Sequence, residues 1–205
     1  MPLEWLALVA AASGACAHLA FKGAMGAGSP AALLRVRWST GAVLMTALLP
    51  LVAGGLHLRP STGLAFLVLG AVLGPVIGWS FYLRALPRLN VSVAQPIFNS
   101  AVLYTMLLAI VFLGERPTPF TLVGAALILL GVQLLQPPRT TPSARAGRMP
   151  GTDILLVLAG ALCLGASSFC FKLGLNELSP VETNWVRTTV PATVLGAVLL
   201  AGWGR

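Results

Sequence analysis

The chain has 205 residues, of which 57% are hydrophobic and only 9% are charged. Soluble domains carry about 25% charged residues, so this composition excludes a water-soluble globular fold. The net charge is +8, but the basic residues are scattered singly between apolar runs and do not form the one basic face of a nucleic-acid-binding protein. Their distribution is typical of interhelical loops and membrane-interface anchors.

Long apolar runs indicate an all-α polytopic membrane protein, a helical bundle in contact with the lipid bilayer. A hydrocarbon core of about 30 Å requires about 20 apolar residues in a helix, and Gly, Pro, Ser and Asn separate the runs. The first run is predicted to be a retained span and not a signal peptide, because Glu4 and no basic residue precedes it. We predict seven transmembrane helices, at 3–23, 33–54, 64–83, 91–113, 120–135, 154–173 and 183–203.

Two stretches of the chain repeat each other at an offset of about 150 residues. The matching pairs are Phe21-Lys22 with Phe171-Lys172, Ser29-Pro30 with Ser179-Pro180, and Val36-Arg37 with Val186-Arg187. We therefore predict a first five-span unit at 1–137, a linker at 138–150, and the first two spans of a second unit at 151–205. Because five is odd, consecutive units insert in opposite orientations, as in the inverted repeats of secondary transporters. At the same offset, a complete second unit ends at about residue 285.

Short motifs in both units resemble a known transporter family. They are Gln95-Pro96 in the fourth span, Gly114-Glu115 after it, the glycine spacing of the fifth span, and the Phe-Lys, Ser-Pro and Arg pattern that opens each unit. Together they resemble the EamA family of the drug/metabolite transporter superfamily. The resemblance implies a ten-span carrier made of two five-span units, and an exporter of amino acids or other small metabolites. The incomplete second unit departs from that pattern.

Lys22 and Lys172 are the only lysines in the chain, and each ends the first span of a predicted unit. Two interpretations remain open. Either they snorkel to the lipid headgroups, or they face the cleft between the units and attract an anionic or zwitterionic substrate. His18 and its counterpart Ser168 lie one helical turn earlier on the same face. His18 is a candidate proton relay or substrate contact, or else a neutral imidazole bonded to a neighbouring helix.

Further polar and aromatic side chains interrupt the apolar spans. Gln95 and Asn99 share one face of the fourth span, so we predict that they point away from lipid and line the substrate cavity. Trp79 and Tyr82 on the third span, and Asn184 on the seventh, are additional candidates for substrate binding. These residues come from different spans, and the sequence does not indicate which of them meet.

The third span carries small residues at helical spacing. Gly70, Gly74 and Gly78 recur every four residues, which predicts a face that a neighbouring helix approaches closely. Pro75 lies beside them and predicts a kink. A flexible wall of the cleft is the alternative interpretation of the same face.

Arg37 and Arg187 occupy equivalent positions in the two units. The apolar runs that follow them are too short to cross a bilayer alone, so we expect both arginines to enter the membrane or its interface. They can bind a carboxylate or phosphate of the substrate, or a lipid phosphate or a helix-end carbonyl. Of the two, Arg187 is a candidate substrate-binding residue. If the last helix begins early, Glu182 can form an ion pair with Arg187.

No catalytic or metal-binding motif occurs in the sequence, so we expect neither an enzyme nor a cofactor. Cys16, Cys163 and Cys170 lie inside apolar runs and are interpreted as packing residues. Glu115 is expected to serve in a turn or a helix cap. The positive-inside rule places the 138–150 linker in the cytoplasm and the N-terminus outside, whereas the family resemblance implies a cytoplasmic N-terminus.

The sequence thus predicts a multi-pass transporter of the bacterial inner membrane that moves a small metabolite by alternating access. A second hypothesis is a truncated or accessory membrane protein that transports nothing alone and pairs with another helical chain. The unfinished second unit would be completed by a second copy of the chain or by further C-terminal helices. No nucleic-acid partner is expected.

Overall fold

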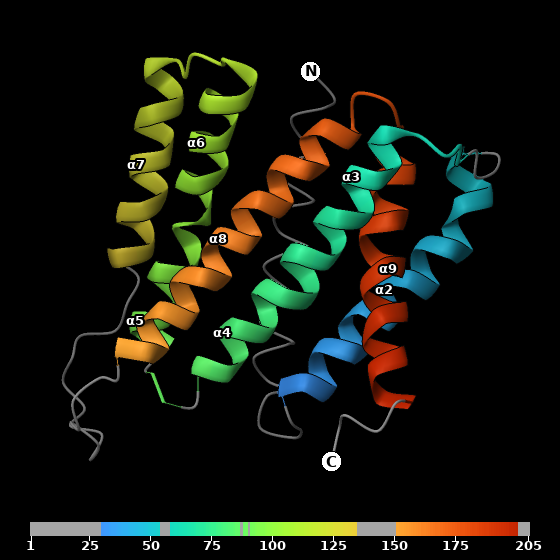
Figure 1. The fold of residues 1–205 in the computed structure, drawn as a ribbon, viewed down its shortest axis with the longest axis horizontal. Coiled ribbons are helices and arrows are strands. Elements are labelled where there is room, and N and C mark those ends of the chain that lie inside the picture. The colour runs from blue at the N-terminus through green and yellow to red at the C-terminus, as the bar shows by residue number, and fades with distance from the viewer. Residues whose placement is uncertain (1–29, 54–57, 87, 90, 135–150, 201–205) are drawn as a thin grey trace.

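The computed structural model describes residues 30–53, 58–86, 88–89, 91–134 and 151–200 (Figure 1). These residues form helices and no strand, which confirms the predicted all-α membrane class. Four stretches within them are long and apolar enough to cross a bilayer: Ala32–Pro50, Thr62–Ala85, Ala94–Leu113 and Gly151–Gly174. The predicted number of seven spans is not confirmed, and the first predicted span lies outside the described residues.

The helices follow the predicted order, with two differences in detail. Their bounds are α2 Pro30–Ala53, α3 Thr62–Ala71, η1 Val72–Gly78, α4 Trp79–Ala85, α5 Val91–Asn99, α6 Ala101–Leu113, α7 Pro119–Leu134, α8 Gly151–Gly174 and α9 Pro180–Leu200. The third span contains the π-helical segment η1. The fourth is interrupted at Ser100, whose hydroxyl donates to the Ile97 carbonyl at 2.6 Å and so competes with the helical hydrogen-bond pattern.

Helix α8 is the centre of the described structure. It packs against the continuous helix α3–η1–α4, and also against α5 and α6 (Figure 1). Helix α9 packs against α2 and α3. The residues predicted to open the second unit therefore lie in direct contact with helices predicted to belong to the first.

The predicted small face of the third span packs tightly on α8. Gly70, Gly74 and Gly78 are all buried. A Cβ atom added at Gly74 would lie 2.6 Å from the Cβ of Ser167, and one added at Gly78 would lie 3.0 Å from the carbonyl oxygen of Gly160. Glycine is therefore what permits the two helices to approach so closely, as the packing interpretation of this face predicts.

Pro75 lies inside the π-helical segment Val72–Gly78, where the sequence predicts a kink. A π-helix bonds each N–H to the carbonyl five residues earlier, and proline has no N–H. The carbonyl of Gly70 consequently lacks its usual donor. The hydroxyl of Ser167 on α8 supplies one at 2.7 Å, so a tertiary contact satisfies the backbone group that proline leaves open.

Two carboxylates stabilise helix starts. Glu182 accepts hydrogen bonds from the backbone N–H and hydroxyl of Ser179, while its own N–H donates to the Ser179 hydroxyl, which forms a capping box before α9. This carboxylate therefore serves the first turn of α9, and its pairing with Arg187 stays a prediction. Glu177 accepts from the backbone N–H of Gly63 at 2.8 Å, and so links the turn before α9 to the start of α3.

The tight contact predicts different effects for two chemically identical substitutions. Gly74→Ala places a methyl group against Ser167 and should lower the free energy of unfolding by about 1–3 kcal/mol. Gly124→Ala on α7 gains the same helix propensity, and nothing lies within 4 Å of its added Cβ. Thermal unfolding of both variants in detergent should show a lower midpoint for the first only. Equal midpoints would contradict the packing account.

Candidate functional site

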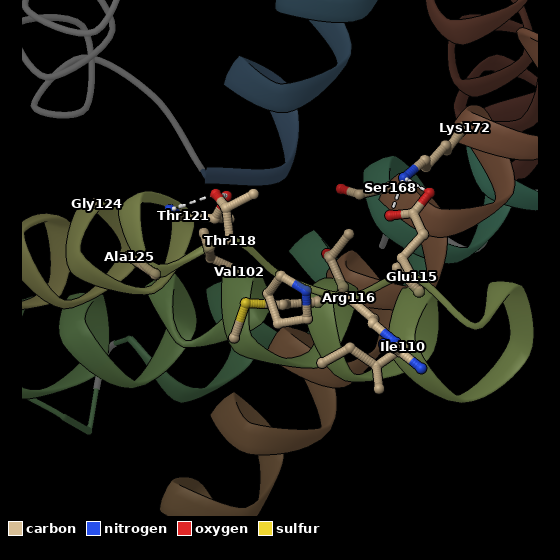
Figure 2. Close-up of a pocket in the computed structure, with 14 residues that line it drawn as sticks. Val102, Ile110, Glu115, Arg116, Thr118, Thr121, Gly124, Ala125, Ser168 and Lys172 are labelled. Atoms are coloured by element: carbon tan, nitrogen blue, oxygen red, sulfur yellow. Dashed lines mark hydrogen bonds and ion pairs between the residues drawn. The ribbon is translucent and has the colours of Figure 1, made fainter.

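A cavity of ≈ 640 Å³ lies between α6, the turn after it, α7 and α8 (Figure 2). Most of its lining is apolar, and includes Val102 and Ile110 of α6 and Ala125 of α7. At one end, Glu115 of the turn faces Lys172 and Ser168 of α8, while the hydroxyls of Thr118 and Thr121 bond to each other elsewhere in the lining (Figure 2). The cavity therefore combines an apolar wall with a charged end, as small-molecule sites commonly do.

The charged end is an ion pair between Lys172 and Glu115. The Lys172 ammonium nitrogen lies 2.5 Å and 2.6 Å from the two carboxylate oxygens of Glu115. Both side chains are 44% exposed, and an exposed pair contributes only about 0–1 kcal/mol to stability. What the pair does is join α8 to the turn between α6 and α7. Ser168, one turn before Lys172, donates to the Leu164 carbonyl at 3.1 Å.

Glu115 has a second role that its place in the Gly-Glu turn did not reveal. The turn itself is as expected: Gly114 has φ 65°, and the N–H groups of Gly114 and Glu115 donate to the carbonyls of Ile110 and Ala109. The side chain, however, reaches Lys172 on another helix. Nothing in the sequence links residues 57 positions apart, so local reasoning missed this contact.

Four predicted site residues from two different spans meet in one group. The Tyr82 hydroxyl donates to the Gln95 side-chain carbonyl at 2.7 Å, and the Gln95 amide donates to the Asn99 carbonyl at 3.2 Å. Trp79 packs edge-on against Tyr82, with ring centroids 5.8 Å apart. Phe98 touches both rings. A buried aromatic cluster thus holds a chain of polar groups between α4 and α5.

The remaining candidates lie elsewhere. Asn184 lines a smaller cavity of ≈ 160 Å³ between α2 and α9. Arg187 lies with its guanidinium carbon 5.5 Å from the ring centroid of Phe171 on α8. His18 and Lys22 are outside the described residues. The predicted site residues that the structure describes therefore do not meet in one place, and of these the large cavity contains Ser168 and Lys172.

Comparison with known proteins identifies the family. The profile of the EamA-like transporter family matches residues 1–135. The chain belongs to this family. The match confirms the resemblance predicted from the Gly-Glu turn and the Phe-Lys pattern, and with the apolar helices it establishes a multi-pass membrane protein of a transporter family.

One curated relative belongs to the bacterium Streptantibioticus cattleyicolor and is named "Probable terminal-alkyne amino-acid exporter". It is 29% identical over 147 residues, which are 72% of this EamA-family chain and 49% of the relative. The chain therefore spans about half the length of this relative.

The two tyrosines of the chain allow a matched test of the polar chain. Tyr82→Phe removes the donor to Gln95 and leaves a half-buried carbonyl unsatisfied, which should lower the free energy of unfolding by about 1–3 kcal/mol. Tyr104→Phe makes the same change at a hydroxyl with no hydrogen bond in the described part of the chain, and should be close to neutral. Unfolding midpoints in detergent measure the difference. A loss of equal size in both variants would contradict the proposed hydrogen bond.

Proposed function

We propose that the protein is a secondary transporter that exports small metabolites, amino acids among them, by alternating access between two inverted units. The observation that carries this proposal is the cavity between α6, α7 and α8, whose charged end joins Glu115 to Lys172. Helices α6 and α7 belong to the first predicted unit and α8 to the second. A binding space between inverted units is the arrangement that alternating access requires.

Polar groups among apolar helices support the same proposal. A side chain such as Gln95 or Asn99 is costly in the membrane unless it has a partner, and such residues commonly mark substrate pathways. Their hydrogen bonds to each other and to Tyr82 keep them together inside the bundle. We propose that this group, His18, Asn184, Arg187 and the two predicted lysine sites contribute to substrate binding as the units move.

Membership of the EamA-like family and the relative's name support an amino acid as substrate. An amino acid is zwitterionic, and it suits a site that offers both a cation and amide oxygens. We place the protein in the bacterial inner membrane, where an exporter of this kind acts. An accessory protein that pairs with another helical chain is the second candidate function.

Reconstituted vesicles test the proposal directly. The protein, expressed from its complete coding sequence, is placed in vesicles loaded with labelled L-propargylglycine, a terminal-alkyne amino acid. We expect it to release the label faster than protein-free vesicles do. Release no faster than from protein-free vesicles would favour the accessory protein.

The lysines provide a second measurement in the same vesicles. Lys22→Ala with Lys172→Ala should reduce the release rate about tenfold, since loss of one charge-assisted contact corresponds to about 1.4 kcal/mol. Arg59→Ala, in the exposed segment before α3, is the control for loss of positive charge and should leave the rate unchanged. If the double variant matched the unsubstituted protein, the lysines would have no electrostatic role in transport.

A further inference from the structure

The charged end of the large cavity pairs one cation with one anion. The Lys172 ammonium of α8 donates to both carboxylate oxygens of Glu115, at 2.5 Å and 2.6 Å. Neither side chain makes another hydrogen bond in the part of the chain that the structure describes. The Arg116 side chain also lines the cavity, but it points away from this pair (Figure 2). The pair itself therefore brings no net charge to this end of the cavity.

The helices that flank the pair are held together independently of it. About two turns before Lys172, the Thr105 hydroxyl of α6 donates to the Gly165 carbonyl of α8 at 3.1 Å. A Cβ atom added at Gly165 would lie 2.7 Å from the Cβ of Tyr104, so the two backbones are in close contact. Since an exposed ion pair contributes only about 0–1 kcal/mol, Lys172 and Glu115 can change partners while α6 and α8 stay packed.

An α-amino acid carries the same two groups as this pair, a primary ammonium and a carboxylate. When it enters, its ammonium can donate to Glu115 while its carboxylate accepts from Lys172. One charge-assisted contact is then replaced by two, and the total charge of the four groups stays zero. The exchange avoids a charge without a partner, which is costly inside a membrane protein.

A molecule that carries only one of the two charges cannot make this exchange. An anion would bind Lys172 and leave Glu115 unpaired, and a cation would do the reverse. Most of the cavity lining is apolar, as at Val102 and Ile110, and a charge is screened less in such surroundings than in water. The cavity should therefore favour a zwitterion over related cations and anions.

We propose that Glu115 binds the ammonium of the transported amino acid and that Lys172 binds its carboxylate, so that the substrate takes the place of the ion pair. This inference rests on the proposed transport function and names the charged form of the substrate that the cavity accepts. The cavity volume of ≈ 640 Å³ lies within the range of about 300–1,000 Å³ that is usual for small-molecule pockets. Glu115 belongs to the first predicted unit and Lys172 to the second, so the substrate replaces a direct contact between the units.

The test compares three labelled compounds that share one side chain: L-propargylglycine, its carboxamide, which is a cation, and its N-acetyl derivative, which is an anion. Release is measured from phosphatidylcholine vesicles, whose lipid has no primary ammonium, at pH 6, below the α-amino pKa of about 7.7–8.0. Release from protein-free vesicles is subtracted. The unsubstituted protein should release the zwitterion at least about tenfold faster than either analogue, a ratio that corresponds to about 1.4 kcal/mol of recognition.

Substitutions in the pair should change this preference in opposite directions. Lys172→Gln keeps only the anion and should shift release toward the carboxamide, whereas Glu115→Gln keeps only the cation and should shift it toward the N-acetyl derivative. Glu115→Lys combined with Lys172→Glu keeps one charge of each sign and should restore the preference for the zwitterion. Arg88→Gln breaks the ion pair with Asp153 at the other end of α8, and this control should keep the full preference. Each ratio is internal to one variant, so it does not depend on the amount of folded protein.

Binding of labelled L-propargylglycine is measured separately, by equilibrium dialysis of the protein in detergent. Binding that both Gln variants weaken, without release, would support the site and overturn the transport function. Release with ratios that the Gln variants leave unchanged would overturn the site, because the pair would then serve only to join α8 to the turn, and would leave transport intact. Absence of both binding and release would overturn both.

Discussion

The close packing of helix α3–η1–α4 on α8 is the contact on which the other described features depend. Glycines at the crossing let the backbones approach to a distance at which an added Cβ would collide. In lipid there is little hydrophobic gain from bringing helices together, so such small-residue contacts must supply the association. The same contact lets Ser167 satisfy the Gly70 carbonyl that Pro75 leaves without a donor. Packing and backbone satisfaction thus support each other.

Charged side chains lie at both ends of α8, and each has the sign that the helix dipole favours at that end. Asp153 lies in the first turn and Lys172 in the last, where each sign is favoured. Arg88 lies 3.4 Å from Asp153, and Glu115 accepts from Lys172. Each ion pair joins α8 to a loop of the preceding helices. Little charge is therefore exposed along the middle of α8, where the neighbouring helices approach it most closely.

The sequence was sufficient to predict the membrane class, the family and several neighbours within one helix. Gln95 and Asn99, four residues apart, indeed share a face and a hydrogen bond. The partner of this pair, Tyr82, came from another span, and its contact depends on the angle at which α4 meets α5. Glu115 is a second example of a contact between distant segments. The turn that contains it was predictable from Gly114, whereas the contact of its side chain with Lys172 was not. Side-chain periodicity reports the neighbours along a helix and contains no information about neighbours across an interface.

What the sequence alone determined is therefore the order and chemical character of the helices. Composition required a membrane, the Gly-Glu turn and the Phe-Lys pattern indicated the EamA-like family, and the spaced glycines predicted a close contact. Only the tertiary structure decided that the contact is with α8 and that Glu115 in the turn after α6 meets Lys172. The reason is physical: local spacing sets which residues share a face, but packing between distant segments sets what that face meets.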